Sequence, residues 1–180
     1  MVLKNGRQQP DERTLKMKKM IAFCLLAVAM LSFSGCASAP QSLSDAVKVA
    51  DMDSKYGLTQ MCKDLREKEY IPEEGVQMKA DVIGAQVGYR FTTEFNSSAI
   101  TLELYEFDTK NLNNDAKDII SQVEKDGQFN MLDFSMVPAT MSDNGKYMMI
   151  YRDNKITGDN PDEQNVQRKE DVTKIFNSAE

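Results

Sequence analysis

The feature that most constrains the fold of this chain is a short apolar run, Met20 to Phe33, near its N-terminus. A helix that spans a bilayer needs about 20 apolar residues to cross a hydrocarbon core of about 30 Å. The run contains fourteen residues, which is too few. Lysines precede it at Lys16, Lys18 and Lys19. A basic start and a short apolar stretch are typical of a secretory signal peptide, so this region is left out of the fold.

The apolar run closes with Leu31-Ser-Phe-Ser-Gly-Cys36, in which small residues stand directly before a cysteine. This segment resembles the signal of bacterial lipoproteins, in which a thioether joins a diacylglyceryl group to the cysteine and cleavage follows immediately before it. The family usually has Leu three residues before the cysteine, and Phe33 is likewise large and apolar. The resemblance implies lipid attachment at Cys36 and a permanent anchor of two or three acyl chains, such as palmitate.

Two alternatives remain for this region. One is an ordinary signal cut after Ala37 or Ala39, and the other is an uncleaved anchor. The polar residues 1–16 fit a signal poorly, because Asp11 and Glu12 stand where basic residues belong. Translation that begins at Met17 and an extended n-region are both compatible with this pattern. We expect residues 1–35 to be the signal, and residues 36–43 to be the lipidated cysteine with a flexible tether.

The remainder of the chain has the size and charge of one acidic exported domain. From Ala37 onward 144 residues remain, which is enough for a single domain, expected at residues 44–180. The chain has 22 basic and 28 acidic residues, of which six and two precede Ala37, so this part has ten more acidic residues than basic ones. Nucleic acid is excluded as a partner by that charge. Membrane attachment should rest on Cys36 instead of on a basic surface.

Lipoproteins of this kind lie on the extracytoplasmic face of a bacterial membrane. Nothing after Cys36 resembles the aspartate that retains lipoproteins in the inner membrane, because Ala37 and Ser38 follow it. We therefore expect the outer membrane if the source has two membranes.

Cysteine is sparse, and the pattern around Cys62 indicates a structural role. Cys24 lies in the signal and Cys36 is the lipid site, which leaves Cys62 without a disulfide partner. Apolar residues fall on one helix face at Leu58, Met61, Cys62 and Leu65. Cys62 is therefore predicted to be a small buried hydrophobe. The alternative is a reactive thiol, which Lys63 alone supports weakly because the chain has no histidine.

The first half of the domain predicts one helix and one hairpin. Ser44 is a candidate cap for a helix from Asp45 to about Tyr70, with Gly57 as a possible interruption and Ile71-Pro-Glu-Glu-Gly75 as its end. Apolar and polar residues then alternate from Val87 to Phe95 and from Ile100 to Tyr105. The intervening Asn96-Ser-Ser98 favours a turn, so these strands should pair as a hairpin, with Gly84 and Gly88 letting the first strand bend.

The second half repeats this order. An amphipathic helix is predicted around Leu112 to Val123, ending at Gly127. Residues 129–137 and 146–151 should form a second hairpin, joined through Pro138 and the turn Asp143-Asn-Gly145. A last helix is expected from Glu163 to Asn177. The predicted fold class is α+β: an antiparallel sheet of two hairpins with helices packed on one face, in the order α-ββ-α-ββ-α.

This layout loosely resembles that of small uncharacterised bacterial lipoproteins. The resemblance is carried by Leu102-Glu-Leu-Tyr-Glu-Phe107 before a helix and by Asn144-Gly-Lys-Tyr-Met-Met-Ile150 in a later strand. It implies no activity.

Catalytic and metal-binding motifs are almost absent. The chain has no histidine, which removes Ser-His-Asp and Cys-His catalysis and the commonest zinc ligand. Ser142-Asp-Asn144 lacks the partner motifs of penicillin-recognising enzymes, so it is interpreted as a turn. Gly84 and Gly88 lack the spacing of a phosphate-binding loop. No cofactor, no metal ligand and no catalytic residue is predicted.

Three acidic or sulfur-rich segments have a structural and a functional interpretation. Asp153 to Gly158 fails the calcium-loop pattern, and the nearby Asp159, Asp162 and Glu163 are expected to be solvated, with weak calcium binding as the alternative. Asp51-Met-Asp53 should be an exposed helix face. The methionines are expected to fill the core, with copper binding or an adaptable surface as alternatives; they include Met131, Met136, Met141, Met148 and Met149.

The tyrosines allow a further alternative. Tyr89, Tyr105, Tyr147 and Tyr151 are expected to be amphipathic residues of the sheet, with a ligand groove as the alternative if their strands are neighbours. The overall expectation is a membrane-anchored binding or interaction module without catalysis, whose partner is an envelope protein or a small ligand. The alternative is an envelope hydrolase that uses paired carboxylates.

Overall fold

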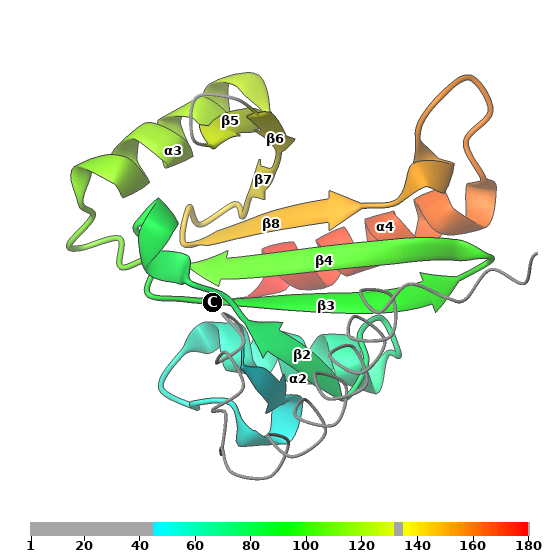
Figure 1. Ribbon diagram of the computed structural model, residues 1–180, viewed down its shortest axis with the longest axis horizontal. Helices are drawn as coiled ribbons and strands as arrows, with labels where there is room; N and C mark the ends of the chain where they lie inside the picture. The colour runs from blue at the N-terminus through cyan, green and yellow to red at the C-terminus, as the bar shows by residue number, and fades with distance from the viewer. Residues whose placement is uncertain (1–44, 132–134, 180) are drawn as a thin grey trace, which may run out of the picture. The chain divides into compact units, whose positions relative to one another are not determined.

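The computed structural model describes residues 45–131 and 135–179. The predicted signal 1–35, Cys36, the tether and Ser44 lie outside them. At the centre is a six-stranded antiparallel sheet with the order β1-β2-β3-β4-β8-β7 (Figure 1). Its strands are β1 (Ala46–Lys48), β2 (Glu74–Gln77), β3 (Val87–Phe95), β4 (Ser98–Glu106), β7 (Thr140–Met141) and β8 (Tyr147–Arg152).

A two-stranded antiparallel sheet stands apart from the main one and consists of β5 (Gln128–Met131) and β6 (Ser135–Pro138). The described residues form three α-helices, α2 (Gly57–Glu67), α3 (Asn114–Asp126) and α4 (Glu163–Ser178). They also form three short 3₁₀ helices, η1 (Val49–Asp51), η2 (Ala80–Ile83) and η3 (Asn154–Ile156). The α+β class is therefore correct. None of the helices in the described stretches is long and apolar enough to cross a bilayer.

The hairpin of β3 and β4 confirms the clearest local pattern in the sequence. The two strands pair over their full length, from Val87 opposite Glu106 to Phe95 opposite Ser98. Asn96 and Ser97 form the two-residue turn with φ angles of 50° and 58°. Positive φ at both positions matches the right-handed twist of the strands, and Asn tolerates it well.

The predicted α3 and α4 helices are also confirmed, and their ends follow local capping rules. The Asn113 side chain accepts a hydrogen bond from the N–H of Ala116 at 2.8 Å, which satisfies a free donor at the start of α3. Gly127 ends α3 with a φ of 66°, and its N–H donates to the Val123 carbonyl. Asp162 caps α4 by accepting from the N–H groups of Gln164 and Asn165.

The helices do not all pack on one face of the sheet, so that part of the prediction is wrong. Helices α2 and α4 cover one face, and Figure 1 shows α4 running behind β4 and β8. Helix α3 packs with η2 and the β5–β6 pair against the other face. The sheet thus has a hydrophobic core on each face. Side chains along β8 point alternately to the two faces, so Tyr147 and Met149 lie in the core with α2 and α4, and Met148 and Ile150 lie in the core with α3.

The predicted helix from Asp45 to Tyr70 is wrong in its first half. Residues Ala46–Lys48 form an edge strand paired with β2, and α2 begins at Gly57 instead of being interrupted there. Backbone bonds fix this arrangement, since the N–H of Gln77 donates to the Asp45 carbonyl at 2.9 Å. Strand β2 was not predicted, because its four residues show no alternation. Sheet pairing overrode the weak helical pattern of this segment.

The second predicted hairpin is also wrong in its pairing. Strand β5 pairs with β6, with Phe129 opposite Val137, while β8 pairs with β4, with Met149 opposite Leu104. The predicted turn does form, since the N–H of Gly145 donates to the Ser142 carbonyl at 2.8 Å, but it joins β8 to the two-residue β7. Apolar side chains of β8 point to both faces of the sheet, as expected for a sheet that is covered on both faces.

The two glycines near β3 have separate roles. Gly84 lies before the strand, at the end of η2, with a φ of 72°. Gly88 lies within β3 directly opposite Tyr105, and a Cβ added there would overlap the Tyr105 ring. Gly88 therefore makes room for a cross-strand aromatic ring.

Candidate functional site

Three carboxylates are buried among the described residues, Glu103, Glu106 and Asp153, and each of them has hydrogen-bond partners. On the α3 side of the sheet, Glu103 Oε1 accepts from the Arg90 Nε at 3.0 Å and pairs with Arg90 Nη2 at 2.9 Å. The Tyr105 hydroxyl donates to Glu103 Oε2 at 2.7 Å. Burial and the Glu103 charge raise the pKa of Tyr105, so the hydroxyl stays protonated. Both oxygens of Glu103 are therefore bonded.

Glu106 points to the opposite face and closes the start of α2. Its Oε2 accepts a hydrogen bond from the backbone N–H of Leu58 at 2.8 Å, and its Oε1 lies 3.5 Å from the Lys146 Nζ. A carboxylate at a helix N-terminus satisfies a free donor and complements the helix dipole. Glu106 therefore holds α2 to the sheet.

Asp153 joins three segments at the far end of β8. Its carboxylate accepts from the Ser98 hydroxyl at 2.6 Å, from the Asn165 side-chain amide at 2.7 Å and from the Lys155 N–H at 2.9 Å. Burial acts to raise the pKa of Asp153, but these hydrogen bonds outweigh it and hold the pKa below its ordinary value. The network connects the β3–β4 turn, η3 and the start of α4.

The acidic loop before α4 does not gather into a metal site. Within residues 45–131 and 135–179, no group of three or more acidic or cysteine side chains has the geometry to hold a metal ion. Asp162 is used as the cap of α4, with its Oδ1 3.0 Å from the Gln164 N–H. Asp159 and Glu163 are exposed. These positions fit the predicted solvated loop.

A hollow of about 620 Å³ lies beside Arg168 of α4, and Tyr70 and Phe95 also line it. Arg168 is 9 % exposed, and its guanidinium carbon lies 5.1 Å from the centre of the Tyr70 ring and 4.8 Å from that of the Phe95 ring. Its Nη2 donates to the Tyr70 carbonyl at 2.8 Å. Arg168 therefore ties α4 to the end of α2 by cation–π contacts and a charge-assisted hydrogen bond.

This hollow contains two carboxylates, Glu163 and Asp171, and Asp171 does not resemble a general acid. The hydrogen bond from Lys174 holds the pKa of Asp171 below its ordinary value. Glu163 is exposed. A carboxyl group that donates a proton near neutral pH needs a raised pKa, which burial normally supplies.

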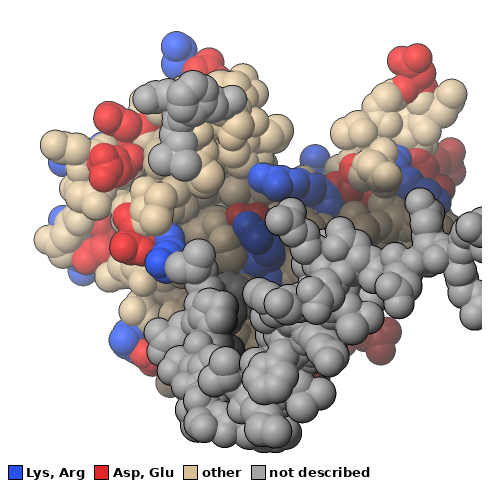
Figure 2. Space-filling view, viewed as in Figure 1, with Lys and Arg blue, Asp and Glu red and all other residues tan. Residues whose placement is uncertain are grey.

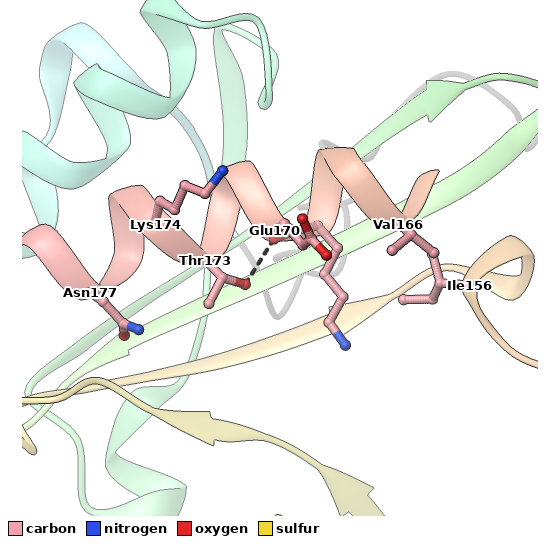
Figure 3. A pocket seen from close by; sticks show the side chains of 7 residues that line it. Ile156, Val166, Glu170, Thr173, Lys174 and Asn177 are labelled. Atoms are coloured by element: carbon pink, nitrogen blue, oxygen red, sulfur yellow. Dashed lines mark hydrogen bonds between the residues drawn. The ribbon is translucent and has the colours of Figure 1, made fainter. Parts of the chain in front are cut away.

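A second hollow of about 500 Å³ runs along another side of α4, and we call it the α4 groove. Its lining residues are Ile156, Val166, Lys169, Glu170, Thr173, Lys174 and Asn177. Figure 3 shows the side chains of Ile156, Thr173 and Asn177 on the side of α4 that faces β8. The groove thus has an apolar end at Ile156 and Val166 and charged side chains along its length.

Beside this groove, strand β8 has an unpaired stretch on its outer side. Strand β7 pairs with β8 only at Met148 and Met149. Residues Ile150 to Arg152 pair with β4 on one side and with no strand among the described residues on the other. We call these three residues the β8 edge. Helix α4 contacts β8, and Figure 3 shows β8 running along the side of α4 on which Thr173 and Asn177 lie.

The residues singled out in the sequence lie in several places. Cys62 is fully buried in the helix face with Leu58, Met61 and Leu65, as predicted. Of the methionines, Met148 and Met149 fill the two cores as expected, whereas Met136 is 54 % exposed.

The tyrosines do not form a groove. Tyr89 and Tyr147 are buried in one core and Tyr105 is buried in the other. The β8 edge and the α4 groove were not predicted, because Ile156, Val166 and Thr173 come together only through tertiary packing.

Comparisons with protein-family models, with curated proteins and with solved structures each found no match.

Proposed function

We propose that this chain is a lipoprotein of the bacterial cell envelope, held on the extracytoplasmic face of a membrane through lipid on Cys36, and that its domain is a binding module without catalysis. The anchor is supported by the residues Leu31 to Cys36 and by the short apolar run before them. In a source with two membranes, the outer membrane is the proposed location. The partner is an envelope protein or a small ligand.

The observation that supports binding best is the unpaired β8 edge beside the α4 groove. Protein interfaces commonly use a sheet edge, because its free N–H and C=O groups need partners. The alternative, a hydrolase with two carboxylates, has less support. Glu103 and Glu106 point to opposite faces and each is bonded to structural partners, whereas glycoside hydrolysis places two carboxylates about 5–10 Å apart in one cleft.

The anchor is tested by the intact mass of the protein extracted from membranes, beside a Cys36→Ala variant. We expect a chain that begins at Cys36 and carries a diacylglyceryl group, and we expect the variant to lack this mass. A soluble chain that begins after Ala37 or Ala39 would show an ordinary signal peptide, and the proposed anchor would be wrong.

The binding role is tested by a photo-crosslinking amino acid placed at Lys169 in the α4 groove, in cells that export the protein. The control position is Lys117, which is exposed on α3. We expect a discrete adduct from position 169 and none from position 117. Equal yields at the two positions, or no adduct at either, would contradict a binding role for this surface.

A further inference from the structure

Within the β8 edge, Tyr151 is the residue whose backbone groups are directed away from β4. The N–H of Ser142 donates to the Tyr147 carbonyl at 2.9 Å, so the backbone groups of Tyr147 face β7. Alternate residues of a strand direct their backbone groups to the same side, and Tyr151 follows Tyr147 by four positions. The N–H and C=O of Tyr151 therefore point away from β4, toward the side where no strand lies among the described residues.

The side of β8 that faces away from β4 borders a hollow of the surface. Figure 1 shows β7 turning away from β8 toward β6, while η3 rises at the other end of β8. In the space-filling view of Figure 2 the same region is a notch between two lobes, with basic side chains at its base. Neighbouring strands lie only about 4.8 Å apart, so an extended segment can approach the edge between these lobes.

The two faces of the sheet present different side chains at the β8 edge. On the α4 side, an added strand would place alternate side chains over the α4 groove, where Ile156, Val166 and Thr173 offer a mainly apolar surface. On the opposite face of the sheet, the side chain of Arg152 is exposed and lies on the same face as that of Ile150. Successive side chains of a strand point to opposite faces. The edge therefore favours a segment in which apolar and polar residues alternate.

The charge at this edge is opposite to that of the domain. Arg152 and Lys169 make no ion pair with any side chain among the described residues, although acidic residues outnumber basic ones by ten from Ala37 onward. Lys174 is paired with Asp171 at 2.9 Å, and Glu170 is the acidic member of the groove. At the strand edge itself, the exposed Arg152 without an acidic partner among the described residues favours acidic side chains in the ligand.

We propose that the β8 edge and the α4 groove bind an extended peptide segment of a partner protein, in which acidic residues alternate with apolar ones, as an added strand. The apolar side chains enter the α4 groove and the acidic ones lie by Arg152. This inference rests on the proposed function as a binding module. It adds the chemistry of the partner and the geometry of its binding.

The test uses the full chain, extracted from membranes in detergent, and a phage-displayed library of random dodecapeptides. We expect enrichment of peptides that alternate acidic and apolar residues. One enriched peptide is then synthesised with N-methyl groups on alternate amides, in two versions. Methylation of the amides that face β8 should weaken binding about tenfold, the loss expected from one or two backbone hydrogen bonds. Methylation of the opposite set should change the affinity little.

Two substitutions locate the peptide. Thr173→Arg fills the α4 groove and should abolish binding, whereas Ser121→Arg, on the exposed side of α3, should not. Arg152→Glu should weaken binding about tenfold by turning attraction into repulsion, and Lys117→Glu is its matched control. All four positions are partly or fully exposed, so the fold should be retained.

Three outcomes would overturn the inference. They are no enrichment from the library, equal effects of the two methylation patterns, and binding that Thr173→Arg leaves unchanged. A dimer of the full chain that Thr173→Arg dissociates would instead identify a second copy as the occupant. If the peptide does not bind, the intact mass of the chain lipidated at Cys36 is still as expected. The lipid anchor and the peptide site are therefore tested independently.

Discussion

The carboxylate of Glu106, in β4, accepts a hydrogen bond from the backbone N–H of Leu58 at 2.8 Å, although 48 positions separate the two residues. A side chain from the sheet thereby caps a helix that provides no side-chain cap of its own. The bond sets where α2 begins and holds it against β4. The same carboxylate lies 3.5 Å from the Lys146 Nζ, which offsets the cost of burying it.

Replacing Glu106 with Gln should lower the free energy of unfolding by about 1–2 kcal/mol, because the N-terminus of α2 and Lys146 both lose the buried negative charge that they contact. Chemical denaturation followed by circular dichroism measures this difference. Glu94→Gln, on the exposed part of β3, is the matched control and should change stability little. Equal stability of the two variants would show that the Glu106 charge does not stabilise α2.

Asp153 should make the domain sensitive to acid. Its pKa in the folded protein lies below the ordinary value despite burial, because Ser98, Asn165 and the Lys155 N–H bond to the ionised form. The stabilisation is therefore complete above about pH 4 and is lost as the pH falls through the lowered pKa.

The matched variant for this effect is Asp153→Asn, which should be less stable at neutral pH by about 2 kcal/mol and should lose less stability on acidification. Urea denaturation at a series of pH values measures both quantities. A variant whose stability falls with pH as steeply as that of the parent protein would show that other carboxylates cause the acid transition.

The buried tyrosines should make the domain sensitive to alkali. Burial raises the pKa values of Tyr89 and Tyr151 to about 12, and it raises that of Tyr105 as well. The unfolded chain releases these protons near pH 10, whereas the folded chain retains them, so stability should fall as the pH rises above about 10.

Ultraviolet absorbance of tyrosinate, followed together with circular dichroism, checks this expectation. Ionisation of these tyrosines should coincide with unfolding instead of preceding it. Tyr105→Phe should make the decline in stability with pH less steep, because one of the shifted groups is removed. Full ionisation of all tyrosines in a protein that stays folded would contradict the burial described here.

Cys62 should be inert toward thiol reagents in the folded protein. It is fully buried in the α2 core, and burial raises the pKa of its thiol, so the reactive thiolate is absent at neutral pH. Alkylation with iodoacetamide, followed by mass mapping of the peptide that contains Cys62, measures this. We expect labelling only in denaturant, and rapid labelling of the native protein would show the reactive thiol considered as an alternative.

Local patterns predicted those elements whose stability is decided within a few residues. The hairpin of β3 and β4 follows from alternation and from a turn at Asn96 and Ser97. Helix α3 follows from its apolar stripe and from Gly127, whose positive φ ends it. In both cases the signals for pairing or capping lie inside the element, so no distant partner was needed to recognise them.

The errors occurred where a distant segment decides the structure. Ala46–Lys48 has a weak helical stripe, but pairing with β2 makes it a strand. The apolar segment Tyr147–Ile150 was assigned to a local hairpin, whereas its main partner is β4, which lies earlier in the chain. Propensity is worth only tenths of a kcal/mol per residue, so a row of backbone hydrogen bonds and core contacts overrides it.

The sequence by itself determined the α+β class, the hairpin of β3 and β4, the amphipathic helices α3 and α4, and the burial of Cys62, because periodicity and capping are properties of adjacent residues. The tertiary structure alone decided which strand β8 joins, which helix covers which face of the sheet, and that the α4 groove lies beside an unpaired strand edge. These depend on contacts between residues far apart in the chain, whose free energies of packing and backbone pairing have no signature in any one segment.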